Sequence, residues 1–106
     1  MNVQVSAMLD HLVHRLVSRL HPKSIYLFGS QARGDANSES DYDLLVVVPE
    51  SPLPRHQRET EAYDALWGLT FPAEIVVLTA EEFEQAQQVH TSLASTVLRE
   101  GTVLYG

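Results

Sequence analysis

The sequence predicts an α/β fold, a small β-sheet with helices packed on it, because stretches with helical spacing alternate with short apolar runs. Apolar residues recur every three or four positions before His21-Pro22, which predicts a helix that ends there. Short apolar runs at 25–28, 41–48 and 74–78 predict strands, and the first two of them end at glycine or proline. Strands that alternate with helices indicate one sheet covered by helices.

The remaining elements follow from the same patterns. Residues 55–69 carry apolar side chains at helical spacing and predict a helix. Thr79 stands three residues before a glutamate, the spacing of a capping box, and predicts the start of another helix. We expect a last helix around 93–98 that is capped by Gly101, followed by a short extended tail over 102–105.

The composition limits the classes of protein that the chain can belong to. Its 106 residues suit a single domain, 1–106, with one core. Acidic residues outnumber basic ones 14 to 7, and this net charge of −7 disfavours general nucleic-acid binding, for which Lys and Arg supply most of the affinity. No segment is apolar enough to predict a membrane span, and the lack of cysteine suits a reducing cytosol, so we expect a cytoplasmic protein.

Asp41 and Asp43 enter the second predicted strand with one residue between them. Residues two apart on a strand point to the same face, so the two carboxylates lie side by side. Such like charges repel unless a cation lies between them, and Mg²⁺ prefers oxygen ligands and bridges carboxylates to phosphates. In the alternative interpretation, Asp41 belongs to a polar loop and Asp43 is simply exposed at a strand end.

Gly29 and Ser30 directly follow the first predicted strand. A glycine there lets a ligand approach the backbone, and the amides of the turn together with the Ser30 hydroxyl can donate to a phosphate. The alternative is a plain turn in which Ser30 is a helix N-cap. A strand, Gly-Ser, ten further residues and then Asp-x-Asp entering a second strand form a more specific pattern than either motif alone.

The chain resembles the DNA polymerase beta superfamily of nucleotidyltransferases through the segments LFGSQARGD at 27–35 and SDYDLLV at 40–46. It is most similar to the minimal nucleotidyltransferases (MNT), and the likeness includes the leading helix and the closing segment 98–105. The resemblance implies the nucleotidyltransferase fold, with a small mixed β-sheet flanked by helices. It also implies Mg²⁺-dependent transfer of a nucleoside monophosphate, AMP from ATP by default, to a hydroxyl with release of pyrophosphate.

The same resemblance implies roles for individual residues. Gly29 and Ser30 correspond to the turn that holds the triphosphate. Asp41 and Asp43 correspond to the catalytic carboxylates that bind two Mg²⁺ ions, and such two-metal sites stabilise the entering and leaving oxygens of an in-line displacement.

Three further positions complete the implied site. Glu74 stands where the family usually has an aspartate, and we expect it to ligate the second metal or to act as general base; the alternative is a wet strand end. Arg33 occupies a position that often faces the nucleotide phosphates, or else it is a solvated loop arginine. Gln31 replaces a second arginine of many relatives. We expect the replacement of the family's aspartate by Glu74 to affect the catalytic rate more than nucleotide binding.

The resemblance also implies a partner. Larger members of the superfamily append domains that recognise the acceptor, so here a partner protein or a second copy would present it, in a homo- or hetero-oligomer. In the minimal family the partner is typically a HEPN-domain toxin, which some MNT antitoxins modify by transferring AMP to a tyrosine. We therefore expect a protein adenylyltransferase that acts as an antitoxin. The alternatives are a catalytically weak binding module that neutralises a HEPN partner by complex formation, and transfer to a small-molecule hydroxyl.

Two other clusters of residues are better explained by the fold than by a function. Arg55, His56 and Arg58 form a small basic cluster at a predicted helix start, which most often indicates a solvated face; the alternative is contact with a partner. Tyr63 and Trp67 lie one helical turn apart, and we expect both in the core; the alternative is a platform on which a base stacks.

Overall fold

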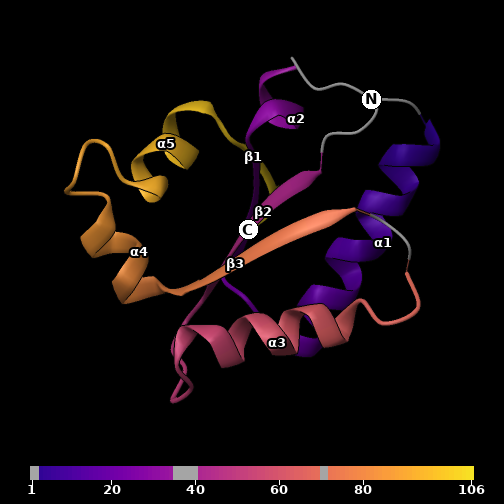
Figure 1. The fold of residues 1–106 in the computed structure, drawn as a ribbon, viewed down its shortest axis with the longest axis horizontal. Helices are drawn as coiled ribbons and strands as arrows, with labels where there is room; N and C mark the ends of the chain where they lie inside the picture. Colours follow the sequence, from indigo (N-terminus) through magenta and orange to yellow (C-terminus); the bar gives the residue numbers. More distant parts are fainter. Residues whose placement is uncertain (1–2, 35–40, 70–71) are drawn as a thin grey trace.

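The computed structural model describes residues 3–34, 41–69 and 72–106, and it contains a four-stranded sheet covered by helices on both faces (Figure 1). This arrangement confirms the predicted α/β class. Among the described residues, no helix is both long and apolar enough to cross a bilayer. The elements follow in the order α1 (Val3–Leu20), β1 (Ser24–Phe28), α2 (Ser30–Arg33), β2 (Tyr42–Val48), α3 (Arg55–Ala65), β3 (Ala73–Thr79), α4 (Ala80–Ala86), α5 (Leu93–Glu100) and β4 (Thr102–Tyr105).

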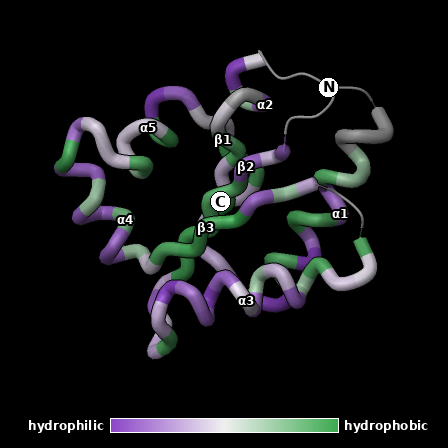
Figure 2. The backbone as a smooth tube through the Cα atoms, viewed as in Figure 1, coloured by the Kyte–Doolittle hydropathy of each residue, from purple (hydrophilic) through white to green (hydrophobic). Residues whose placement is uncertain are grey.

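The sheet has the strand order β3-β2-β1-β4 and is mixed. Strand β1 runs antiparallel to both of its neighbours, whereas β2 and β3 are parallel. Apolar residues gather along the strands (Figure 2). Because successive side chains of a strand point to opposite faces, the sheet contributes to two cores, one beneath α1 and α3 and the other beneath α4 and α5.

Helix α3 is shorter than the sequence predicts, because it ends at Ala65 rather than at 69. Gly68 adopts φ +87° in the turn that follows, a left-handed conformation that cannot continue a helix. The expectation of a core position for Trp67 is therefore wrong, since its side chain leaves the helical face and is 85% exposed. Tyr63 is also an exposed residue rather than a core one, although its hydroxyl accepts a hydrogen bond from the Ile75 amide at 2.8 Å.

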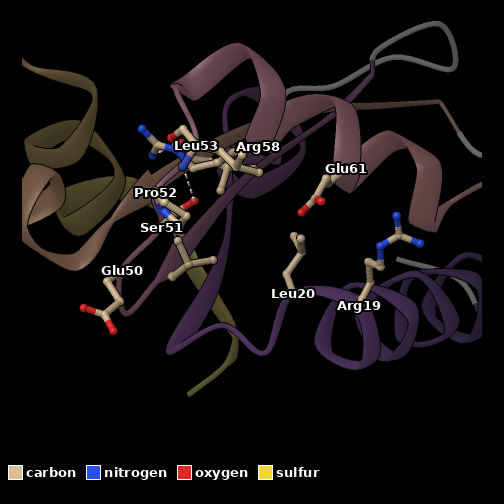
Figure 3. Close-up of a pocket in the computed structure, with 10 residues that line it drawn as sticks. Arg19, Leu20, Glu50, Ser51, Pro52, Leu53, Arg58 and Glu61 are labelled. Carbon is tan, nitrogen blue, oxygen red and sulfur yellow. Dashed lines mark hydrogen bonds between the residues drawn. The ribbon is translucent and has the colours of Figure 1, made fainter.

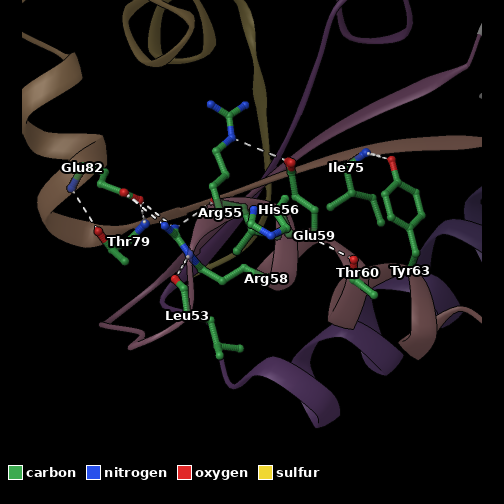
Figure 4. A network of polar contacts seen from close by, with 11 residues as sticks. Leu53, Arg55, His56, Arg58, Glu59, Thr60, Tyr63, Ile75, Thr79 and Glu82 are labelled. Carbon is green, nitrogen blue, oxygen red and sulfur yellow. Dashed lines mark hydrogen bonds and ion pairs between the residues drawn. The ribbon is translucent and has the colours of Figure 1, made fainter.

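Arg58 corrects a second expectation, because it is buried and not part of a solvated face. Its Nε donates to the Leu53 carbonyl at 3.0 Å and its Nη1 donates to the Val77 carbonyl at 3.1 Å. Its guanidinium also binds both carboxylate oxygens of Glu82, at 2.7 and 3.1 Å (Figure 4). One buried cation thus joins the segment before α3, strand β3 and helix α4.

Glu82 also completes the predicted capping box of α4, which the structure confirms. Its amide donates to the Thr79 hydroxyl at 3.1 Å, and its carboxylate accepts from the Thr79 amide at 2.8 Å. The hydrogen bond from Arg58 and the one from the Thr79 backbone hold the pKa of Glu82 well below its usual value, at about 2. The carboxylate is therefore a structural group that stays ionised at neutral pH.

Replacing Arg58 by alanine should lower the free energy of unfolding by about 2–4 kcal/mol, because the Val77 carbonyl and the Glu82 carboxylate lose their partner. Urea denaturation measures the effect. Arg55→Ala is the matched control: Arg55 pairs with Glu59 at 3.6 Å on the exposed side of the same helix, and its loss should cost less than about 0.5 kcal/mol. Equal effects of the two substitutions would contradict the assigned role of Arg58.

Stability should fall at acid pH in a way that depends on Glu82. The folded pKa of about 2 lies below the ordinary value of 4.5, so the ionised carboxylate stabilises the fold above pH 4.5. That contribution should shrink as the pH falls from 4.5 towards 2. The pH dependence of urea unfolding, compared between the natural chain and Glu82→Gln, isolates the contribution. Parallel profiles for the two proteins would rule it out.

Candidate functional site

Three neighbouring strands bring Gly29, Asp43 and Glu74 to one end of the sheet. In the strand register, Asp43 lies opposite Phe28 on one side and opposite Glu74 on the other. Paired residues of adjacent strands point to the same face of a sheet, so the carboxylates of Asp43 and Glu74 share a face. Gly29 follows Phe28 immediately, at the level of this pair.

Gly29 is held in a conformation and a space that only glycine fits. Its φ of +75° lies in the left-handed region. A Cβ atom added there would overlap Oδ2 of Asp43. The Asp43 carboxylate therefore rests against the backbone of Gly29. The motif spacing indicates that the two residues belong to one site, but only the structure shows their direct contact.

Burial and neighbouring carboxylates both disfavour the ionised form of Asp43. Partial burial raises the pKa of Asp43, and the nearby carboxylates of Glu74 and Asp41 raise it further, while Arg33 lowers it. Asp41 and Glu74 are exposed, whereas Asp43 is half-buried between them. Negative charge concentrated in this way favours a bound cation, because a cation offsets the mutual repulsion of the carboxylates.

The carboxylates of the site can supply part of the coordination that Mg²⁺ requires. Within the described ranges, no group of three or more His, Cys, Asp or Glu side chains is placed to hold a metal ion. The assignment of Asp41, Asp43 and Glu74 as metal ligands thus stays a prediction. Mg²⁺ commonly takes only one or two carboxylates and completes its octahedron with water and substrate phosphates, a coordination that Asp41 and Asp43 can supply.

The residues predicted to bind the nucleotide surround the same point. The backbone of Ser30 begins α2 directly after Gly29, and the Arg33 amide donates to the Gly29 carbonyl at 3.1 Å. Arg33 is exposed and close enough to the carboxylates to lower the pKa of Asp43. Asp35 and Ser40, which belong to the sequence motif, lie outside the described residues. Phosphate binding by Gly29, Ser30 and Arg33 stays a prediction.

A separate cavity of about 320 Å³ lies at the other end of the sheet (Figure 3). It is lined by Val48, the last residue of β2, whereas the carboxylates stand at the beginning of that strand. Arg58, which lines it as well, already binds Glu82 and two backbone carbonyls. We therefore do not assign this cavity to the carboxylate site.

Comparison with known proteins gives the same family from sequence and from structure. The model of the nucleotidyltransferase domain family matches residues 9–104. The chain is 31% identical over 98 residues to the protein adenylyltransferase MntA of Thermococcus cleftensis, an alignment that covers 92% of this chain and 89% of that protein.

Two solved structures share the fold. One is a crystal structure of a toxin–antitoxin with AMP-PNP, which is 26% identical, has a TM-score of 0.64 and is matched over 92% of this chain and 73% of that one. The other is a tri-AMPylated HEPN toxin of Shewanella oneidensis in complex with an MNT antitoxin, which is 25% identical with a TM-score of 0.51, over 94% of this chain and 71% of that one. The predicted nucleotidyltransferase fold is confirmed.

Replacing Gly29 by alanine should both destabilise the protein and displace the Asp43 carboxylate. Gly34→Ala is the matched control, because Gly34 has a similar φ of +83° but open space where its Cβ would lie. We expect Gly34→Ala to cost about 1 kcal/mol of unfolding free energy, and Gly29→Ala to cost about 2 kcal/mol or more. Urea denaturation and titration with Mg²⁺ and a fluorescent ATP analogue measure both effects.

Only Gly29→Ala should weaken nucleotide binding. Equal losses of stability and binding in the two variants would show that the backbone conformation alone matters, and that the contact with Asp43 does not.

Proposed function

Because the chain belongs to the nucleotidyltransferase domain family, and within it to the minimal nucleotidyltransferases that include the MntA protein adenylyltransferases, we propose that it transfers AMP from ATP to a tyrosine of a HEPN-domain toxin. In this role it acts as the antitoxin of that toxin. The proposed setting is the cytoplasm, where ATP is available. The chain is an enzyme of the nucleotidyltransferase class; the metal, the acceptor residue and the partner are the proposed parts.

The observation that carries this proposal is the close packing of Asp43 against Gly29, with Asp41 and Glu74 nearby. A negatively charged cluster is a poor place for a triphosphate unless a cation joins the two. The backbone amides of the turn at Gly29 and Ser30 can donate to a phosphate group. The same point of the fold thus offers cation ligands and backbone donors for an anion, as transfer from a nucleoside triphosphate requires.

In the proposed reaction the acceptor oxygen attacks the α-phosphorus, the bond from that phosphorus to the α,β-bridging oxygen breaks, and pyrophosphate leaves. Asp41 and Asp43 would hold Mg²⁺, and the ion would supply positive charge against the negative charge that grows on the transferring group. The turn at Gly29 and Ser30, together with Arg33, orients the triphosphate. Glu74, exposed beside Asp43, accepts the proton of the acceptor hydroxyl.

The choice of partner and acceptor is supported by the solved relatives. One relative is a toxin–antitoxin structure with AMP-PNP, a nonhydrolysable analogue of ATP. Another pairs an MNT antitoxin with a HEPN toxin that carries three AMP groups. The two structures support ATP as the donor and a HEPN toxin as the acceptor for this chain.

Incubation with α-³²P-ATP, Mg²⁺ and the HEPN-domain protein encoded beside this chain tests the proposal. The natural chain should label the partner on tyrosine, and an Asp41→Asn, Asp43→Asn double variant should lower the labelling rate at least about 100-fold. An Asp10→Asn, Glu84→Gln double variant removes two exposed carboxylates elsewhere and should keep the natural rate. Absence of label on the partner would refute AMP transfer.

The same variants separate catalysis from simple binding. If the Asp41→Asn, Asp43→Asn protein still neutralises the toxin in cells, then the chain acts as a binding module and transfer is dispensable. The family usually has an aspartate where this chain has Glu74, and this difference favours the binding module over the enzyme.

A further inference from the structure

Trp67 is the only tryptophan of the sequence and, among the residues that the structure describes, the most exposed large apolar side chain, at 85%. Tyr63, one helical turn earlier, is 44% exposed. Solvent exposure of a tryptophan gives up the large free energy that its burial would contribute, and exposed aromatic side chains that adjoin one another indicate a binding surface. Tryptophan, tyrosine and arginine are also the residue types that dominate the affinity of protein interfaces.

The fold holds this surface in place. Nη1 of Arg15, on α1, donates to the Trp67 carbonyl at 2.7 Å and to the Ala65 carbonyl at 3.4 Å. The Tyr63 hydroxyl is fixed by the Ile75 amide of β3 (Figure 4). Both aromatic residues are therefore anchored to neighbouring elements. An ordered surface loses less conformational entropy when a partner binds.

A groove of about 380 Å³ between α1 and α3 continues the surface. It contains two of the seven Lys and Arg residues of a chain whose net charge is −7. With two arginines against one carboxylate, that of Asp64, the groove is locally basic on an acidic molecule and attracts an acidic segment of a partner. The groove is lined by His14, Arg15, Ser18, Arg19, Asp64 and Ala65.

The Trp67 end of this surface lies near the end of the sheet that carries the carboxylates, whereas Arg19 also lines the cavity at the opposite end. Helix α3 ends beside Trp67, and residues 66–72 lead from it to the start of β3, where Glu74 stands. Tyr63 hydrogen-bonds the residue next to Glu74. The carboxylates face the layer of α4 and α5, and Trp67 lies on the layer of α1 and α3. A bound protein would therefore reach from one face to the other around the start of β3.

We propose that Trp67, Tyr63 and the basic groove between α1 and α3 form the docking surface for the protein whose hydroxyl receives AMP. The partner contributes an acidic segment that lies in the groove and an apolar side chain that covers Trp67. This inference rests on the proposed function, which names that partner as the HEPN-domain protein. It adds which face of this chain the partner binds and the chemistry by which it does so.

Binding of the HEPN-domain protein to variants of the full chain tests the inference by calorimetry. Trp67→Ala should raise the Kd about 10-fold or more, and Arg19→Glu should raise it about 5-fold or more, with a stronger effect at low salt. The matched controls are Leu98→Ala, a half-exposed apolar residue of α5, and Arg55→Glu on α3, and both should leave the Kd unchanged. Titration with Mg²⁺ and an ATP analogue should give the same affinity for all four variants.

Trp67 itself provides a second readout. Incorporation of 5-hydroxytryptophan at this single site allows selective excitation in the presence of the partner. Its emission should shift to shorter wavelength, and its quenching by acrylamide should fall, when the partner covers it. In steady-state labelling, Trp67→Ala should raise KM for the partner while kcat stays near the natural value.

The outcomes separate the inference from the proposed function. Label transfer with an unchanged Kd for Trp67→Ala overturns the docking surface and leaves the function standing. A Kd that depends on Trp67, without label transfer, supports the docking surface and refutes the transfer. If no complex forms, both are refuted. A single-stranded oligonucleotide that quenches Trp67 where the protein partner does not would overturn the docking surface too.

Discussion

The packing of the Asp43 carboxylate against the bare backbone of Gly29 is the constraint on which the rest of the site depends. It requires that β1 and β2 pair in one register, with Phe28 opposite Asp43. A slip by one residue would turn the carboxylate into the core of α1 and α3 and would move each of the buried residues that follow it into the opposite core. The run Leu44–Val48, buried on both faces of the sheet, makes such a slip very costly. The hydrophobic core therefore fixes the position of the charged site.

The site is also a place where the fold is locally unfavourable. Burial and two neighbouring carboxylates raise the pKa of Asp43, so its charge opposes folding when no cation is present. Sites that concentrate charge for catalysis commonly carry such a cost, and the rest of the molecule offsets it. Here the offset lies in the buried strands and in the Arg58 network at the opposite end of β3. The Arg58 network, which stabilises the fold, and the carboxylates of the candidate site thus lie at different ends of the sheet.

Local patterns predicted the elements well, and contacts distant in sequence were the parts that they missed. The apolar runs and the capping box at Thr79 depend on neighbours a few residues away, so the sequence alone reveals them. The spacing of Gly-Ser and Asp-x-Asp located the site for the same reason. Arg58 looked like a surface residue because its partners, Val77 and Glu82, lie 19 and 24 residues further along the chain. Nothing in a helical pattern indicates that an arginine will be buried.

The edge of β3 shows why those distant contacts matter for function. As the last strand of the sheet, β3 has outward-facing backbone groups that a foreign strand could pair with. The Tyr63 hydroxyl accepts a hydrogen bond from the Ile75 amide, and the Glu82 carboxylate accepts one from the Thr79 amide. The Arg58 guanidinium donates one to the Val77 carbonyl.

With these groups satisfied by side chains, the edge is a poor template for strand addition. A partner that approaches β3 must then be recognised through side chains such as Trp67, and not through the backbone. The same helix, α3, therefore both closes the edge of the sheet and, at its end, displays the residue that we propose the partner contacts.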